Sequence, residues 1–179
     1  MKRDKLYIYS DIKTWEGRWE LIDGVPFKTP APSRIHQEIS GELFYQLRNF
    51  FKEDGCRVYS APTDVFLRET DEYANPDTVV QPDILVVCDE NKLMDKGVKG
   101  APDFIVEIVS PSTAIKDRNQ KRPLYQKHGV KELWIIDPAH PFIEQYDFIA
   151  GTERVWSSEE EIQSSLFKGF SVNVNSLIK

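Results

Sequence analysis

The sequence contains few cysteines and no long apolar run, and each shortage excludes a class of protein. Only two of its 179 residues are cysteines, Cys56 and Cys88, and their spacing forms no CxxC motif. The sequence therefore predicts neither a disulfide framework nor a zinc site, and we expect two buried thiols. No stretch approaches the roughly 20 apolar residues that span a bilayer, and no apolar signal segment follows Met1. We expect a cytoplasmic protein without a membrane partner.

The motifs of several enzyme classes are missing as well. There is no glycine-rich phosphate loop, no GxSxG turn and no HExxH pair, which excludes nucleotide kinases, serine hydrolases of that type and zincins. Basic residues are also in the minority, since 23 Lys and Arg stand against 29 Asp and Glu, a net charge of −6. This balance argues against an extended basic surface that binds nucleic acid. It does not exclude a local site, because a bound divalent ion reverses the sign of a carboxylate pocket.

What is present is typical of a globular protein. Hydrophobic residues make up 40% of the chain and charged residues 29%. A length of 179 residues suits a single domain over 1–179. The order of periodic segments predicts an α/β chain with α+β character: a helix, several strands, a βαβ unit and further strands.

Two segments have helical periodicity. Ser33 is a candidate N-cap, and apolar residues then recur every three or four positions, so an amphipathic helix is predicted from about 34 to 52. Residues 111–113 supply a break and a cap for a second helix from about 113 to 128, which Gly129 closes. Each helix should bury one face against a sheet.

Strand patterns fill most of the remaining chain. Residues 19–22 and 25–27 flank an Asp23-Gly24 turn and predict a β-hairpin. Residues 104–109 are apolar on both alternations, which indicates a central strand covered on two faces. The other predicted strands are 57–60, 64–67, a longer one at 79–87, 133–137, 142–148, 152–156 and a short one at 169–172.

Two carboxylates stand where a sheet normally places apolar side chains. Asp83 lies early in the predicted strand 79–87, and Glu107 lies in the middle of 104–109. Burying an isolated carboxylate costs roughly several kcal/mol, so such groups are paired, protonated or bound to a cation. Neighbouring strands would bring the two within reach of one hard, oxygen-seeking ion such as Mg²⁺ or Mn²⁺. We therefore predict a hydrolytic metal site with Asp83 and Glu107 as ligands.

Lys121 is the third candidate for this site. Glu107 lies about 10 Å before the end of its strand, and Lys121 lies about 13 Å down the following helix. If the helix folds back over the sheet, the ammonium and the carboxylate come abreast. Lys121 also shares a helical face with Asp117, Leu124 and Tyr125, and this face must meet the sheet. A lysine there can stabilise charge developing on a phosphate or orient the attacking water.

Six segments form a specific combination when they are taken jointly and in order. They are WELIDG at 19–24, the histidine of HQEI at 36–39, QPDI at 81–84, EIVSPS at 107–112, Asp117 with Lys121, and GVKELWIID at 129–137. This combination resembles the Uma-two family of putative restriction endonucleases over nearly the whole chain. The resemblance implies the PD-(D/E)XK nuclease fold, a restriction-endonuclease-like mixed β-sheet flanked by α-helices, with a nuclease core at about 15–148.

The resemblance also carries expectations about chemistry and partners. It implies DNA as the substrate, Asp83 and Glu107 as metal ligands, and Glu20 as an additional acidic member of the site. A homodimer is expected, because nucleases of this fold often cut two strands with two subunits. The sequence departs from the superfamily pattern at Val109, where a lysine would follow Glu107. The likeness is then to a variant in which the lysine has moved to the next helix, at Lys121.

Each candidate also has an interpretation without catalysis. Backbone amides could satisfy Asp83 at a strand start, and a buried salt bridge to the helical lysine could satisfy Glu107. Glu20 could be a solvated residue on an edge hairpin. His36, a secondary candidate, could cap its helix or face water. Asp117, the other secondary candidate, could simply hold the lysine through i, i+4 pairing.

Two functions follow from these alternatives. The first is a metal-dependent endonuclease that acts on DNA. The second is a non-enzymatic binding or regulatory module that keeps the nuclease fold within a mobile-element or defence complex. The acidic balance favours the second, because a protein partner needs no basic groove. Fold alone does not decide between them, since one fold hosts many functions.

Overall fold

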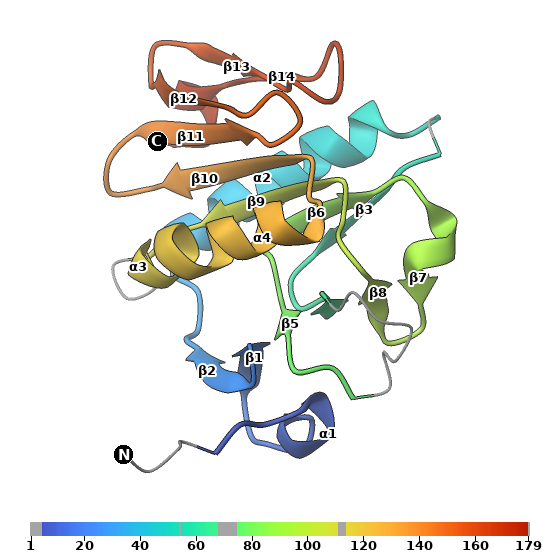
Figure 1. Ribbon diagram of the computed structural model, residues 1–179. Helices are drawn as coiled ribbons and strands as arrows, with labels where there is room; N and C mark the ends of the chain where they lie inside the picture. The colour runs from blue at the N-terminus through green and yellow to red at the C-terminus, as the bar shows by residue number, and fades with distance from the viewer. Residues whose placement is uncertain (1–4, 54, 68–74, 111–113, 179) are drawn as a thin grey trace.

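The computed structural model describes residues 5–53, 55–67, 75–110 and 114–178. Its strands form two six-stranded sheets and a two-stranded one, arranged as Figure 1 shows. The order of the main sheet is β12-β11-β10-β9-β6-β3, and that of the second sheet is β2-β1-β5-β4-β8-β7. No helix in these ranges is long and apolar enough to cross a membrane.

The bounds of the elements are as follows. The main sheet contains β3 (Arg57–Ser60), β6 (Ile84–Val87), β9 (Phe104–Ile108), β10 (Glu132–Asp137), β11 (Phe142–Asp147) and β12 (Thr152–Ser157). The second sheet contains β1 (Arg18–Ile22), β2 (Val25–Thr29), β4 (Val65–Phe66), β5 (Val79–Val80), β7 (Leu93–Met94) and β8 (Gly97–Lys99), and the small sheet contains β13 (Glu161–Gln163) and β14 (Ser171–Asn173). The helical segments are α1 (Tyr9–Ile12), α2 (Arg34–Phe50), η1 (Glu90–Lys92), α3 (Ala114–Lys116), the π-helical η2 (Asp117–Lys121), α4 (Arg122–His128) and α5 (Val174–Leu177).

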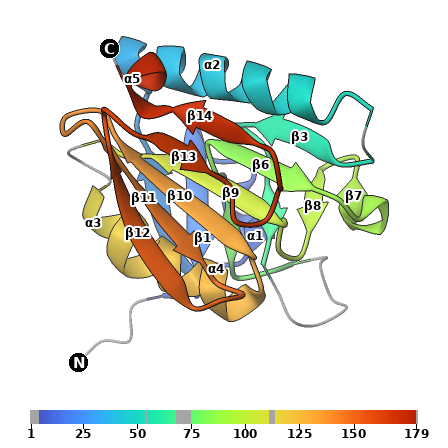
Figure 2. The same cartoon turned by 90° about the horizontal axis from the view of Figure 1, so that it is seen from above.

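Helices cover both faces of the main sheet, with α2 and α5 on one face and α3 and α4 on the other (Figure 2). The side chains of β9 alternate between these faces: Phe104 and Val106 pack in the cluster that contains α2, and Ile105 packs in the cluster that contains α4. Glu107 therefore points to the α4 face. The parallel strands β9 and β10 are joined through the α3–η2–α4 segment, as the βαβ prediction requires.

The predicted helix over residues 34 to 52 forms as α2. The Ser33 side chain caps it by accepting a hydrogen bond of 3.2 Å from the amide of His36. The buried stripe consists of Ile39, Leu43 and Leu47, with the four-residue spacing of a helix face. Because this stripe is fixed on the sheet, the first turn of α2 is held at a defined place, and His36 with it.

The predicted hairpin forms as β1 and β2 around the Asp23-Gly24 turn. Both turn residues have positive φ, 49° for Asp23 and 78° for Gly24, as a two-residue hairpin turn requires. On its other side β1 pairs with β5, with Leu21 opposite Val79. This pairing places the hairpin beside the chain that leads from β5 to β6.

The predicted strand 79–87 is wrong as a single element. It divides into β5, which belongs to the second sheet, and β6, which belongs to the main sheet. Pro82 lies between them and has no amide hydrogen for a β-ladder, so the run cannot continue as one strand. Asp83 consequently lies in the bend where the chain passes from one sheet to the other, directly before β6.

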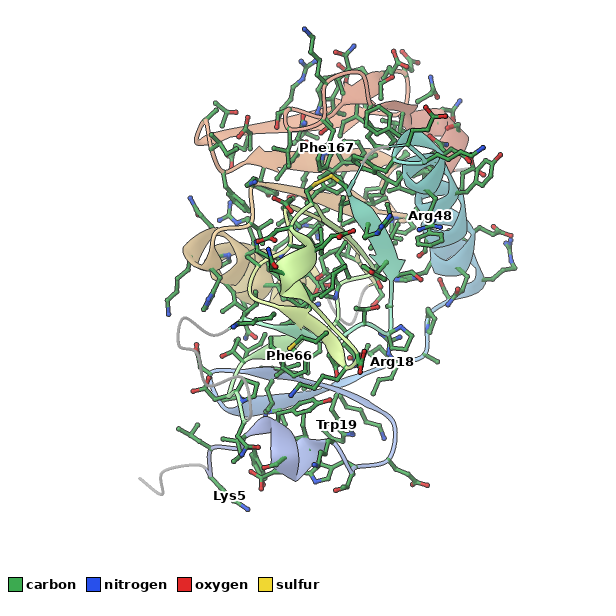
Figure 3. The ribbon with its side chains drawn as sticks, turned by 90° about the vertical axis from the view of Figure 1, so that its right-hand side faces the viewer. Lys5, Arg18, Trp19, Arg48, Phe66 and Phe167 are labelled. Carbon is green, nitrogen blue, oxygen red and sulfur yellow. A yellow bond between two sulfur atoms is a disulfide. The ribbon has the colours of Figure 1, made fainter. Side chains whose placement is uncertain are left out.

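The prediction of two buried thiols is also wrong, because Cys56 and Cys88 form a disulfide. Arg57 pairs with Val87 in the antiparallel register of β3 and β6, and one further step sets the two cysteines opposite each other. The contact depends on this register, and a separation of 32 residues gives no local signature of it. Figure 3 shows the bond as a yellow link near Phe167.

Candidate functional site

A cavity of about 500 Å³ opens between the main sheet, the β1–β2 hairpin, the start of α2 and the α3–η2 segment. All of the predicted site residues line it: Glu20, His36, Asp83, Glu107, Asp117 and Lys121. Other charged or polar residues on its walls include Arg18, Gln81, Lys116, Arg118, Asp137 and His140. The fold thus gathers around one hollow side chains that are far apart in sequence.

Asp83, directly before β6, and Glu107, in β9, both face this cavity. Ile84 pairs with Val106 in the antiparallel register of β6 and β9. One further step sets Asp83 opposite Glu107, and directly opposite residues point to the same face of a sheet. Asp83 is fixed there because its Oδ2 accepts a hydrogen bond of 2.7 Å from the amide of Ile108. The two carboxylates therefore lie on the same side of the sheet, the side that α4 covers.

Glu107 is buried, and its partners come from the helical segment above it. Its Oε1 accepts hydrogen bonds from Lys121 Nζ, at 2.8 Å, and from the Tyr125 hydroxyl. Burial raises the pKa of Glu107 to about 8; the positive charge of Lys121 opposes this rise, and the negative charges of Asp117 and Asp83 add to it. The Glu107 carboxyl group therefore takes up a proton more readily than an exposed glutamate does.

Lys121 lies between two carboxylates, where the strand and helix lengths predicted it. Its side chain is 3% exposed, and its Nζ is 2.7 Å from Glu20 Oε1 and 2.8 Å from Glu107 Oε1. Asp117 Oδ1 lies 3.8 Å away, in the i, i+4 relation that the sequence predicted. Burial disfavours the charged amine, but Glu107 and Glu20 raise the pKa of Lys121 well above its ordinary value. Lys121 is therefore a buried cation.

Glu20 is not the solvated residue that an edge hairpin would present. Its side chain is 1% exposed. Its Oε2 is 2.6 Å from Lys116 Nζ, and its Oε1 accepts a hydrogen bond of 2.8 Å from the amide of Gln81. Burial would raise the pKa of Glu20, but the charges of Lys121 and Lys116 and the hydrogen bonds together lower it to about 2. Glu20 is therefore an anion that holds two lysines in place.

Regular helical spacing does not predict Lys116 as a site residue, because the helix is not regular at this point. In the π-helical η2, the amide of Arg122 bonds to the carbonyl of Asp117, an i→i+5 contact. Such a turn brings residues five apart onto one face, so Lys116 and Lys121 both reach Glu20. The prediction used α-helical spacings of three and four, which leave Lys116 off that face. The predicted break and cap at 111–113 lie outside the described residues.

Tyr125 and Gln81 are two further partners of the site acids. The helical spacing predicts that Tyr125 faces inward, and its hydroxyl donates to Glu107. Gln81 belongs to the QPDI motif, and its backbone amide donates to Glu20. Their positions in the sequence indicate the site, since Gln81 is two residues before Asp83 and Tyr125 is four residues after Lys121.

His36 faces the cavity rather than the solvent. Its Nε2 is 3.1 Å from Asp83 Oδ1, and its side chain is 16% exposed. Its Nδ1 is buried and has no hydrogen-bond partner among the residues that the structure describes. The Asp83 carboxylate is thus held from two sides, by the imidazole at one oxygen and by the amide of Ile108 at the other.

The carboxylate oxygens of Asp83 and Glu107 suit a hard divalent cation that takes few protein ligands. Asp83 and Glu107 offer carboxylates to the same cavity, and a cation there would favour the ionised form of Glu107, whose pKa is raised mainly by burial and less by the charges of Asp117 and Asp83. Mg²⁺ often takes one or two protein carboxylates and completes its shell with water and phosphate. Across residues 5–53, 55–67, 75–110 and 114–178, no group of three or more His, Cys, Asp or Glu side chains forms a metal cluster. The two carboxylates that line the cavity are the number of protein ligands that such a water-rich Mg²⁺ site uses.

Comparison with known proteins places the chain among nuclease folds. The sequence model of the Uma2 family, described as a putative restriction endonuclease, matches residues 7–175. An uncharacterised protein of Synechocystis sp. is 25% identical over 126 residues, which are 68% of this chain but only 63% of that protein's length. The crystal structure of a putative nuclease belonging to DUF820 from Anabaena variabilis matches with a TM-score of 0.78 at 20% identity, over 95% of this chain and 94% of the other. The predicted fold class is confirmed.

Proposed function

This chain belongs to the Uma-two (Uma2) family of putative restriction endonucleases, and on that premise we propose that it is a metal-dependent endonuclease that hydrolyses DNA phosphodiester bonds. The observation that carries the proposal is that Asp83 and Glu107 line one cavity, one step beyond the β6–β9 register, with the buried Lys121 bonded to Glu107. In this proposal Asp83 and Glu107 hold Mg²⁺ or Mn²⁺, and Lys121 acts on the phosphate or on the attacking water.

The protein groups have separate tasks in this proposal. A divalent cation held by the two carboxylates would polarise the phosphodiester and lower the pKa of a bound water. Lys121 supplies a fixed positive charge where charge develops on the phosphate. Glu20 keeps that amine charged and in place, 2.7 Å away. Tyr125 and Lys121 both bond to Oε1 of Glu107, so these two side chains would orient the carboxylate that holds the cation.

The substrate and the assembly are carried over from the family. A cavity of about 500 Å³ can take the reacting phosphate and its neighbouring groups, while the bulk of a duplex would lie outside it. Each subunit has one such cavity, so a homodimer would be needed to cut both strands in one encounter. Light scattering after size-exclusion chromatography, with and without a duplex oligonucleotide, tests this assembly.

Plasmid cleavage tests the enzymatic proposal. Purified protein with Mg²⁺ or Mn²⁺ should nick supercoiled DNA or cut single strands, and Asp83→Asn should remove this activity while the melting temperature changes little. Asp89→Asn is the matched control, because Asp89 caps η1 outside the cavity and asparagine caps a helix equally well. Equal inactivity of the wild type and Asp83→Asn across metals and substrates would contradict the proposal.

One observation favours the alternative, a catalytically silent binding or regulatory module. Glu107 already has Lys121 and Tyr125 as partners, and Asp83 already has His36, so the acids are satisfied without a metal. Calorimetric titration with Mn²⁺ separates the two functions. Binding that is lost in Glu107→Gln supports the enzyme, whereas no binding at millimolar Mn²⁺ supports the module.

A further inference from the structure

Four lysine and arginine side chains line the cavity, and three of them are engaged with carboxylates. The fourth is Arg18, a half-buried residue of β1. Among the residues that the structure describes, no carboxylate lies within ion-pair distance of Arg18. A guanidinium that lines a cavity without an anionic partner is available to an anionic ligand. The three paired cations are Lys116 and Lys121, which bind Glu20 at 2.6 and 2.7 Å, and Arg118, which binds Glu144 at 2.6 Å.

A chain of hydrogen bonds fixes the orientation of Arg18. Its Nε donates to Oε1 of Gln81 at 3.0 Å, and the Nε2 of Gln81 donates to Oδ1 of Asp64 at 2.8 Å. The Tyr9 hydroxyl donates to the other oxygen of Asp64 at 2.8 Å. Burial and this hydrogen bond raise the pKa of Tyr9 to about 12, so the hydroxyl stays protonated and continues to donate. Within the described part of the chain, the guanidinium is therefore held through its Nε–H, and both Nη groups face no hydrogen-bond acceptor there and can bind a ligand.

The position of Arg18 relative to the acids defines which part of a substrate it could reach. Arg18 and Glu20 are two residues apart in β1 and so point to the same face, about 7 Å apart along the strand. Figure 3 shows Arg18 on the side of the hairpin that faces the main sheet, with Trp19 below it. Glu20 bonds to Lys121 beside Glu107, so Arg18 lies at the rim of the same site and not at its centre.

We propose that Arg18, oriented by Gln81, is a phosphate-binding subsite that holds a phosphodiester flanking the one that is cleaved. The inference rests on the proposed nuclease function and deepens it, because it assigns the backbone contact of the nucleic acid. It also explains how a chain of net charge −6 could bind a polyanion locally. Arginine suits this task, since its two Nη groups can bond to two oxygens of one phosphate. Gln81 is a positioning residue in this proposal, because it acts through Arg18.

Binding of a fluorescein-labelled oligonucleotide, followed by anisotropy over a series of salt concentrations in Ca²⁺, tests the subsite. Arg18→Ala should weaken binding about tenfold and reduce the slope of log K against log salt by about 0.7 for a single strand or 0.9 for a duplex. Arg18→Lys should keep the slope but lose affinity, because the lysine ammonium keeps the charge but lacks the planar guanidinium that can bond to two phosphate oxygens. Gln81→Ala should weaken binding about threefold with the slope unchanged, since the charge remains and only its orientation is lost. Arg48→Ala, an exposed arginine of α2 outside the cavity, is the matched control and should change little.

The outcomes separate this inference from the nuclease proposal. If the wild type cleaves DNA and Arg18→Ala binds the oligonucleotide with unchanged affinity and slope, the subsite is wrong and the enzyme stands. If the wild type binds but does not cleave, and Arg18→Ala loses affinity and slope, Arg18 is a phosphate-binding residue and the enzyme fails, together with the flanking position of that phosphate. A wild type that binds no oligonucleotide overturns both. Melting temperatures of all variants show whether the role of Arg18 is only structural. The loss of a structural contact would lower the melting temperature without changing the salt slope.

Discussion

Glu107 and Glu132 are both buried carboxylates in central strands of the main sheet, but different groups bind them. Glu132 in β10 is fully buried and accepts hydrogen bonds from neutral groups, among them Trp134 Nε1, Gln145 Nε2 and Ser164 Oγ, each at 2.7 Å. Glu107 instead shares one oxygen between a charged lysine and a tyrosine and lines a cavity. Glu132 ties a following segment to the sheet, whereas Glu107 has the surroundings of a site that exchanges a proton or a cation.

The raised pKa of Glu107 predicts how metal affinity depends on pH. A cation needs the ionised carboxylate, and with a folded pKa of about 8 the proton competes with the cation throughout the range below that value. The apparent Mn²⁺ affinity should therefore rise about tenfold per pH unit from pH 6 and level off near pH 8. Calorimetry at pH 6, 7 and 8 measures this, with Glu107→Gln as the variant that should bind weakly at every pH. Equal affinity of the wild type at pH 6 and pH 8 would show that Glu107 is not a ligand.

The residue patterns predict which carboxylates are buried, but they do not predict which of these line a cavity. Asp83 and Glu107 stand out in the sequence because charge is unexpected in a buried run, yet the same argument applies to Glu132, which does not line the cavity. What separates the two glutamates is the face of the sheet and the side chains that cover it. Those follow from the packing of η2 and α4 and not from the strand sequences.

At the scale of elements, the π-helical turn decides which lysines reach the site. The sequence predicted the helix and the inward face of Lys121, but its regular spacing could not place Lys116. The extra residue in the turn rotates the preceding segment, so two lysines five positions apart bind one carboxylate. Turns of this kind are frequent at functional sites, which agrees with the location of η2 on the cavity wall.

Removing one residue from η2 tests this reading of the turn. Asn119 is exposed, and its deletion should let the segment close as an ordinary α-helix. Lys116 would then rotate away from Glu20, so we expect DNA cleavage to fall at least tenfold because one cation of the site is misplaced. Circular dichroism should remain close to that of the wild type. Asn119→Ala keeps the length of the turn and should retain activity; equal activity of the deletion variant would show that the turn has no part in the site.

The split of residues 79–87 has a similar origin. Its composition is that of one strand, and the break at Pro82 was visible, but the sequence gives no sign that the two halves belong to different sheets. The hairpin, α2 and the βαβ unit were predictable because each is encoded by local turns and periodicity. The joining of the two sheets depends on long-range pairing, as between β1 and β5.

At the scale of the whole molecule, the cavity exists because two sheets meet where the chain passes between them. Asp83 lies in that passage, Glu20 comes from the second sheet, and Glu107 comes from the main sheet. The cysteine bridge strengthens the far edge of the main sheet by linking β3 to β6. Such bonds persist in oxidising compartments and are rare in the cytosol, so the state of this pair in cells also tests the predicted cytoplasmic location.

Reduction of the Cys56–Cys88 bond should lower the free energy of unfolding by about 3–4 kcal/mol, because it releases a closed loop from the unfolded chain. Urea unfolding with and without dithiothreitol measures the difference. The double variant Cys56→Ser with Cys88→Ser should unfold like the reduced protein and should not respond to the reagent. A wild type with the same midpoint in both conditions would mean that the bond does not form or does not stabilise the fold.

The placement of a hard cation between Asp83 and Glu107 is tested most directly by the anomalous difference map of a crystal soaked in Mn²⁺. We expect a peak about 2–2.5 Å from a carboxylate oxygen of each residue, and no such peak in crystals of Glu107→Gln treated in the same way. Mn²⁺ bound elsewhere on the protein, with this cavity empty, would contradict the claim.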